Sequence, residues 1–139
     1  MWGAIKYLDF TTFRADKQRP GNPAGPGPNA DLVIDVVTVD SSGKPTSTLS
    51  SNSIPPGRIG YSPRNVVVPA NATGSNPAIN EGSTYGIYVH TTSTSGCYGF
   101  AHNDNNPYSA GKEYYSNNGG ATFALEPNRA LKVKTVAQP

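Results

Sequence analysis

The chain has 139 residues, of which 14% are charged, and its formal net charge at pH 7 is +2. This length suits a single domain with one core. Because the basic residues are scattered and no apolar run approaches the roughly 20 residues of a membrane span, the sequence argues against a nucleic-acid partner and against a membrane partner.

The first predicted strand covers residues 4–13, where Ile5, Leu8 and Phe10 alternate imperfectly with polar neighbours. Imperfect alternation is typical of a strand that carries a bulge or a bend. Residues 14–30 follow, and the stretch 14–29 contains four prolines and three glycines, which interrupt the hydrogen bonding of helices and ladders. We interpret 14–30 as a surface loop or arm, with a flexible domain linker as the alternative.

The strongest strand prediction is the apolar run 32–39, which is typical of a central strand with both faces covered. Asp35 within it requires a partner, because a buried carboxylate is costly when it stands alone. Residues 40–45 are predicted to form a turn by their Asp, Ser, Gly and Pro chemistry. Next come a short edge strand at 46–53 and a further strand at 64–69, which its proline ends.

The segments 84–90 and 97–102 alternate in the same way, and we predict that they are neighbouring antiparallel strands joined by an exposed hairpin loop. In the first of them, Tyr88 and His90 share one face. The last strands are expected at 114–115, 121–125 and 131–136. Short strands at this spacing predict an all-β fold, an antiparallel two-sheet β-sandwich that is jelly-roll-like and has eight or nine strands in a single domain.

The single cysteine, Cys97, cannot form an internal disulfide, and we expect it to be a small buried hydrophobic residue. The first residues lead almost at once into a strand and have neither the basic segment nor the apolar core of a signal peptide. We therefore expect the chain to be a piece of a longer precursor and Met1 to be an artificial start.

The order of landmarks from residue 32 onward is distinctive. The landmarks are Leu-Val-Ile-Asp-Val-Val-Thr-Val-Asp at 32–40, Glu-Gly-Ser-Thr-Tyr-Gly-Ile-Tyr-Val at 81–89, Cys-Tyr-Gly-Phe-Ala at 97–101, Asn-Pro-Tyr-Ser-Ala-Gly at 106–111, Gly-Gly-Ala-Thr-Phe at 119–123 and Leu-Lys-Val-Lys-Thr at 131–135. This order resembles the jelly-roll-like accessory modules of secreted bacterial polysaccharide-degrading enzymes and cell-surface proteins, many of which are grouped with carbohydrate-binding modules.

The resemblance implies a two-sheet module in a secreted or cell-surface protein, joined to the catalytic domain of a larger protein, with a polysaccharide or another glycan as its partner. Similar modules also serve as spacers, since a fold does not fix a function. One position departs from the pattern. The stretch at 119–123 ends in Phe123, where the class often has tryptophan, and the only tryptophan is Trp2.

Glycan binding needs flat aromatic faces that stack on sugar rings, with amides and carboxylates that hydrogen-bond the hydroxyls. The region 102–115 offers this mixture, and we predict the ligand-binding residues there: Asn103, Asp104, Asn106, Tyr108, Tyr114 and Tyr115. Because Asn, Asp and Pro are also the ordinary residues of tight turns, a plain connection is the alternative. Tyr88, Tyr98 and Trp2 are other aromatic platforms, although tyrosines on sandwich strands more often belong to the core.

Asp104 is also the candidate metal ligand. Its carboxylate and the side-chain carbonyls of Asn103, Asn105 and Asn106 are the oxygen ligands that Ca²⁺ prefers, although their spacing does not match an EF-hand loop. His90 and His102 raise the question of zinc, yet no Cys or acidic residue stands at metal-ligand spacing beside them. Calcium is therefore the one cofactor that the sequence suggests.

Hydrolysis of a glycan would need two carboxylates that face one cleft, and Glu113 with Glu126 is the pair to test. The favoured interpretation of this pair is that both are solvated turn residues near Lys112 and Arg129. No family signature surrounds Cys97 to make it a nucleophile. We therefore predict a protein without catalytic activity.

The leading functional hypothesis is a non-catalytic carbohydrate-binding accessory module that binds glycan through aromatic and Asn-rich loop residues. The alternative is a structural or assembly subunit, such as a capsid-decorating, fibre or filament protein. In that alternative, residues 14–30 form an arm that packs on a neighbouring copy, and self-assembly takes the place of glycan binding.

Overall fold

The computed structural model describes residues 3–15, 27–70, 78–80, 83–103, 112–126, 130–131 and 133–138. Within these ranges the chain forms twelve β-strands and one short 3-10 helix, η1 (Pro56–Arg58), so the predicted all-β class is confirmed. All the strand pairs are antiparallel. The strands outnumber the eight or nine predicted because three of them have only two residues: β5 (Ala78–Ile79), β8 (His102–Asn103) and β11 (Ala130–Leu131).

The larger sheet is built around β1 (Gly3–Ala15). Its strand order is β12-β1-β4, and β5 and β7 pair with the two ends of β1. These partners are β4 (Arg64–Pro69), β7 (Cys97–Phe100) and β12 (Val133–Gln138). The register between β1 and β12 shifts between Ile5 and Tyr7, which confirms the irregularity predicted for this strand.

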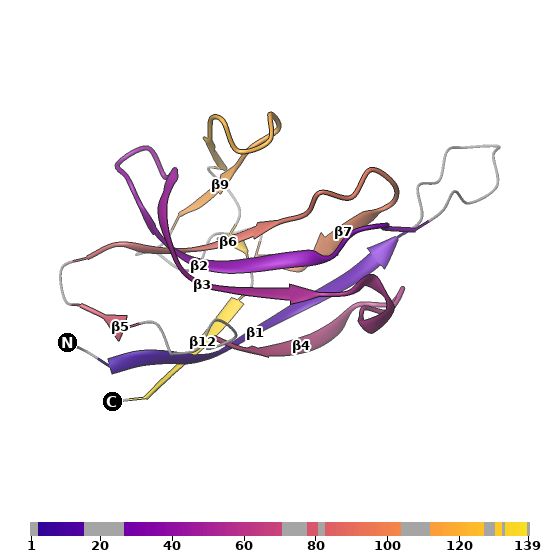
Figure 1. Ribbon diagram of the computed structural model, residues 1–139, viewed down its shortest axis with the longest axis horizontal. Coiled ribbons are helices and arrows are strands. Elements are labelled where there is room, and N and C mark those ends of the chain that lie inside the picture. Colours follow the sequence, from indigo (N-terminus) through magenta and orange to yellow (C-terminus); the bar gives the residue numbers. More distant parts are fainter. Residues whose placement is uncertain are drawn as a thin grey trace.

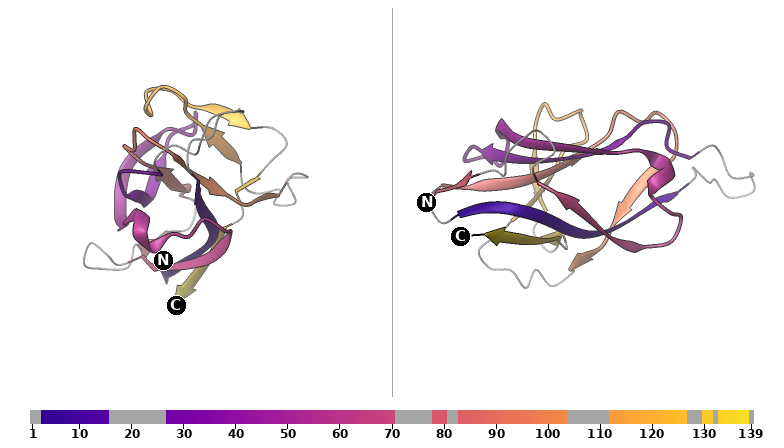
Figure 2. Two further views of the ribbon diagram at one scale, coloured as in Figure 1. Left: turned by 90° about the vertical axis from the view of Figure 1, so that its right-hand side faces the viewer. Right: turned by 60° about the horizontal axis from the view of Figure 1, so that its bottom comes forward.

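The second sheet has three strands in the order β3-β2-β6. They are β2 (Leu32–Val39), β3 (Pro45–Ile54) and β6 (Tyr85–His90). The apolar strand β2 is central, as its composition predicted, and β3 is an edge strand, although it is ten residues long rather than short. The two sheets lie one over the other in Figure 1, and their strands run along the long axis of the molecule in the right-hand view of Figure 2.

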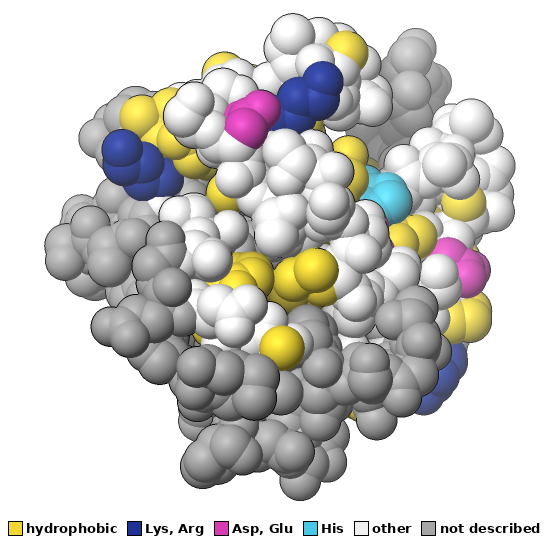
Figure 3. Space-filling view, turned by 60° about the vertical axis from the view of Figure 1, so that its left-hand side comes forward, with side chains coloured by type: hydrophobic (Ala, Val, Ile, Leu, Met, Phe, Trp, Pro, Cys, Tyr) yellow, Lys and Arg dark blue, Asp and Glu magenta, His cyan; other side chains and the backbone are white. Residues whose placement is uncertain are grey.

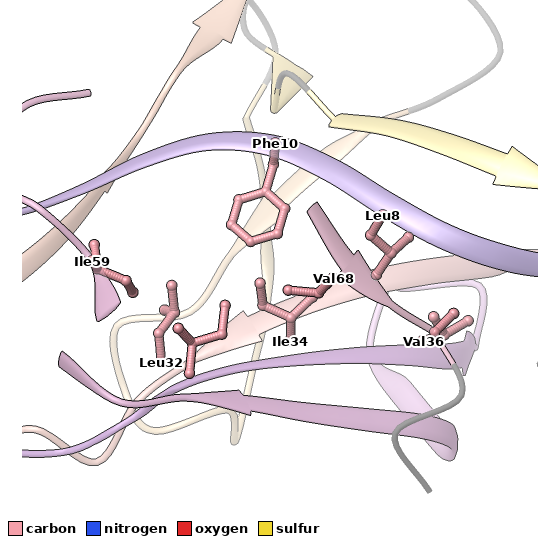
Figure 4. Close-up of a cluster of buried hydrophobic side chains, with 9 residues drawn as sticks. Leu8, Phe10, Leu32, Ile34, Val36, Ile59 and Val68 are labelled. Atoms are coloured by element: carbon pink, nitrogen blue, oxygen red, sulfur yellow. The ribbon is translucent and has the colours of Figure 1, made fainter. Parts of the chain in front are cut away.

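The core lies between the two sheets, and residues of both sheets contribute to it. Period-2 alternation sends every second side chain of a strand inward, so Leu8 and Phe10 of β1 meet Leu32, Ile34 and Val36 of β2 (Figure 4). Each of these five side chains is at most 4% exposed. Burial of one such side chain stabilises the fold by about 1.5–3 kcal/mol, so this cluster is the main force that holds the sheets together.

The predicted loop 14–30 begins inside a strand, because Arg14 and Ala15 belong to β1. Residues 16–26 lie outside the described part of the chain. Residues 27–30 lie against the connection 91–96: the Asn29 backbone N–H donates to Ser93 Oγ (3.0 Å), and the Ser95 hydroxyl donates to the Gly27 carbonyl (2.7 Å). This end of the predicted loop is therefore fastened to the chain's own surface.

The predicted pairing of the segments 84–90 and 97–102 is wrong. The strand β6 pairs with β2 in the three-stranded sheet, whereas β7 pairs with β1 in the larger one. The connection 91–96 therefore carries the chain from one sheet to the other. Cys97, the first residue of β7, was expected to be buried and is exposed.

Candidate functional site

A cleft of about 1310 Å³ opens along β6, an edge strand of the three-stranded sheet. We call it the β6 cleft. It is lined by residues 37, 39–41, 43 and 45 of β2 and its turn to β3, 84–92 of β6 and its flanks, Phe100 of β7, and 112–117, 119–120 and 123 of the hairpin formed by β9 (Glu113–Tyr115) and β10 (Ala124–Glu126). In Figure 1, β9 and its turn stand above β6.

The strand β6 supplies the floor of the cleft. Because Ile87 and Val89 pack against the core, the alternation of the strand turns Tyr88 and His90 to the opposite face. Their rings stack with centroids 4.4 Å apart and planes 19° apart. Phe123 of the hairpin turn meets Tyr88 edge-on, with centroids 5.9 Å apart. Three rings from two elements thus form one continuous aromatic surface.

Two glycines let the hairpin approach this floor. The ring of Tyr114 lies over Gly43, where three ring atoms stand 2.7 Å from the position that a Cβ would take, and Gly43 has a φ of +81°. Gly120 has a φ of +86°, and the Tyr88 hydroxyl lies 2.9 Å from the position that a Cβ at Gly120 would take. A larger side chain at either glycine would occupy space that these rings fill, so the width of the cleft depends on both.

Hydrogen bonds fix the turn between β9 and β10. The Gly120 N–H donates to Ser116 Oγ (2.9 Å), the Thr122 N–H donates to Asn118 Oδ1 (3.0 Å), and Asn118 Nδ2 donates to Thr122 Oγ1 (2.7 Å). Side chains that satisfy backbone donors in this way hold a turn in one conformation. Phe123 is therefore carried on an ordered turn.

Asp35 lies beneath the aromatic floor. Its Oδ2 has a hydrogen-bond partner, whereas its buried Oδ1 has none among the described residues. Asp35 is 6% exposed, stands opposite Tyr88 in the β2–β6 register, and its Oδ2 lies 2.8 Å from His90 Nε2. The His90 side chain is 33% exposed and the Asp35 side chain 9%. The contact therefore ties the imidazole at the floor of the cleft to a carboxylate below it.

Among the residues that the structure describes, three charged side chains line the β6 cleft, and they are of both signs: Asp40, Lys112 and Glu113. The Asp40 carboxylate accepts hydrogen bonds from the Ser42 hydroxyl (2.7 Å) and from the backbone N–H groups of Ser42 (2.8 Å) and Lys44 (3.0 Å). These bonds, the Ser42 hydroxyl first, lower the pKa of Asp40 below its ordinary value. Asp40 is therefore a fixed negative charge at the turn between β2 and β3.

Two of the predicted ligand-binding residues, Tyr114 and Tyr115, line the cleft, and Tyr115 is 48% exposed at its rim. Asn103 belongs to β8, where it stands opposite Ala130. The other three predicted residues lie outside the described part of the chain: Asp104, Asn106 and Tyr108. Among the described residues, the site is therefore built from β6 and the β9–β10 hairpin, with the turn between β2 and β3.

Glu113 and Glu126 were interpreted as turn residues, but they stand directly opposite each other in the β9–β10 pair. Glu113 lines the cleft and Glu126 does not. Among the described residues, no group of three or more His, Cys, Asp and Glu side chains is placed to hold a metal ion. The calcium prediction rested on Asp104, which lies outside them.

Sequence reasoning undervalued Tyr88, His90 and Phe123. Alternation in the sequence indicates that Tyr88 and His90 share one face of the strand. It does not indicate what that face contacts, because this depends on which strand pairs with β6. Tyr98, the other tyrosine considered as a platform, packs against the core and donates its hydroxyl to the Ala30 carbonyl (2.6 Å).

Comparison with protein-family models, with curated proteins and with solved structures gives no match to this chain. None of the described segments forms a helix with the length and apolar character that crossing a bilayer requires.

Proposed function

We propose that this chain is a non-catalytic glycan-binding module of a secreted or cell-surface protein, and that the β6 cleft holds the glycan. The observation that carries the proposal is the aromatic lining of the cleft by Tyr88, Phe123, Tyr114 and Tyr115, with His90 stacked on Tyr88. Aromatic faces suit the apolar faces of sugar rings, and exposed aromatic surface in a concave site is typical of ligand binding.

The polar groups of the cleft support the same ligand. Hydroxyl and amide side chains of Ser41, Thr84, Thr91 and Asn117 line it beside the aromatic rings. Such groups hydrogen-bond sugar hydroxyls without adding charge. The volume of about 1310 Å³ exceeds the roughly 300–1,000 Å³ of ordinary small-molecule pockets, which favours a stretch of several sugar units over a single sugar.

The surface charge is also compatible with an uncharged polymer. On the face shown in Figure 3, the basic, acidic and histidine side chains are few and of both signs, and most of the remaining described surface is uncharged. A ligand with many negative groups would find no basic field to attract it there. The resemblance of the landmark order to accessory modules of polysaccharide-degrading enzymes supports the same class of ligand.

The experiment is affinity electrophoresis of the purified chain in gels that contain plant, fungal or bacterial polysaccharides. We expect retardation by at least one polymer, and we expect Tyr115→Ala to weaken this binding about three- to tenfold, the effect of removing one stacking ring. The matched control is Tyr61→Ala. Tyr61 is 56% exposed but lies outside the cleft, where the Arg14 guanidinium sits 4.3 Å from its ring centroid.

If no polymer slows the migration of the chain, the proposal is contradicted. If Tyr61→Ala loses as much affinity as Tyr115→Ala, the placement of the site is contradicted.

The alternative function, a structural or assembly subunit, is favoured by the exposed Tyr61 and by Val67, which is 58% exposed on the outer side of β4. Sedimentation separates the two functions, because an assembly subunit associates at micromolar concentration and a binding module remains a monomer.

A further inference from the structure

The contact between Asp35 and His90 constrains where the imidazole carries its proton. An ionised carboxylate has only acceptor atoms, so the hydrogen in the 2.8 Å contact between Asp35 Oδ2 and His90 Nε2 must come from the histidine. In a neutral imidazole one nitrogen is protonated and the other is an acceptor. A proton held on Nε2 therefore leaves Nδ1 as the acceptor.

The geometry also indicates which edge of the imidazole remains available. Asp35 is only 6% exposed as a residue, so the Nε2 edge that touches it is the buried edge. One face of the ring is covered by Tyr88. The two ring nitrogens point away from each other, Nδ1 has no hydrogen-bond partner among the described residues, and His90 lines the cleft.

We propose that the buried Asp35 is a positioning residue, whose carboxylate fixes His90 as the Nε2-protonated tautomer. The β6 cleft then presents Nδ1 as a hydrogen-bond acceptor, which selects neutral glycans that have a hydroxyl at this point. This inference rests on the proposed function and names the ligand class for the same site. An anionic sugar that turns an acceptor oxygen to Nδ1 makes no hydrogen bond there.

The first measurement is the imidazole nitrogen spectrum of the free protein at neutral pH, by long-range ¹H–¹⁵N correlation. We expect the His90 resonances to report a protonated Nε2 and an unprotonated Nδ1. The Asp35→Asn variant keeps the shape of the side chain, but an amide can donate to Nε2 as well as accept from it. We therefore expect both tautomers in this variant, whereas the control Asp9→Asn, outside the cleft, keeps one.

The second measurement adds the neutral polysaccharide that is retained best and a uronic-acid polymer. We expect the Nδ1 resonance of His90 to move when the neutral polymer binds. We expect His90→Arg, whose guanidinium donates to Asp35 but has no acceptor atom, to bind it roughly three- to tenfold more weakly. The uronic-acid polymer should bind less tightly than the neutral one.

The outcomes separate this inference from the proposed function. Three outcomes overturn the inference and leave the function standing, provided that a glycan binds and that the binding depends on Tyr115. They are a protonated or unresponsive Nδ1, full affinity in His90→Arg, and a preference for the uronic-acid polymer. A single Nε2-protonated tautomer and full affinity in Asp35→Asn overturns the role of Asp35. Absence of binding to every polymer overturns both.

Discussion

A single hydroxyl group, that of Tyr98, joins β7 of the larger sheet to Ala30, which lies two residues before β2 of the three-stranded sheet. It donates to the Ala30 carbonyl at 2.6 Å, and the ring packs against the core. Partial burial raises the pKa of Tyr98 above its ordinary value of 10, and the negative charge of Asp31 raises it further, while Arg14 acts in the opposite direction. The folded state therefore favours the protonated hydroxyl.

The first prediction at this scale concerns Tyr98→Phe. The loss of one hydrogen bond should lower the free energy of unfolding at pH 7 by about 1 kcal/mol. Because the pKa is raised in the folded state, the stabilising contribution of Tyr98 is complete below pH 10 and is lost as the pH rises through the folded-state pKa. Urea unfolding should thus give a difference between wild type and variant that shrinks at strongly alkaline pH.

The control for this prediction is Tyr61→Phe, which removes a hydroxyl from an exposed ring. We expect it to change the free energy of unfolding by less than about 0.5 kcal/mol. A Tyr98→Phe variant as stable as the wild type at pH 7 would show that the hydroxyl contributes nothing to the stability of the folded state. A difference that grows with alkaline pH would contradict the raised pKa of Tyr98.

At the scale of elements, the turn between β2 and β3 supports the hairpin that faces it. Gly43 occupies this turn with a positive φ, and the Tyr114 ring fills the space above it. Gly43→Ala should lower the free energy of unfolding by about 1–3 kcal/mol, from backbone strain and overpacking together. It should also weaken glycan binding, because the displaced ring belongs to the cleft.

Gly57→Ala is the matched control, since no atom lies within 4 Å of its Cβ position and its φ is not positive. Chemical denaturation and affinity electrophoresis of both variants make the comparison. If Gly43→Ala unfolds and binds as Gly57→Ala does, the close approach of Tyr114 to this turn is not what shapes the cleft.

The extents of the elements were largely predictable, because alternation with a period of two is a local property of the sequence. The run 32–39 and the segment 64–69 match β2 and β4. Pairing is not local. A connection of six residues such as 91–96 can close a hairpin or cross between sheets, and the pairing of β7 with β1 distinguishes the two cases.

The candidate site was predictable to the same degree. Tyr114 and Tyr115 were found because adjacent aromatic residues in a polar region are conspicuous. His90 was considered as a zinc ligand and Asp35 as a residue in need of a partner, but nothing in the sequence joined them across 55 positions. Their contact follows from the β2–β6 register, which sequence reasoning did not provide because it had assigned β6 to another neighbour.

At the scale of the whole molecule, stability depends on one core that both sheets share. Leu8→Ala in β1 and Ile34→Ala in β2 should each lower the free energy of unfolding by about 2–5 kcal/mol. Because both side chains belong to one cluster, the double variant should deviate from additivity by about 0.5–3 kcal/mol. Denaturant unfolding of the four proteins of the cycle measures this coupling.

Val67→Ala is the reference substitution on the outer surface, and we expect it to cost less than about 0.5 kcal/mol. Strict additivity of Leu8→Ala and Ile34→Ala, or two separate unfolding transitions, would mean that the sheets form independent units rather than one sandwich.

The antiparallel pairing of β1 with β12 determines how the module responds to mechanical tension. Ala4 stands opposite Gln138 at one end of their ladder, and both strand ends lie at the same end of the molecule in Figure 1. A force that pulls Gly3 and Gln138 apart acts on one hydrogen-bonded pair at a time rather than on the whole ladder at once. Under load, β12 would therefore peel away first, and one edge of the larger sheet would open while the three-stranded sheet and its cleft remain intact.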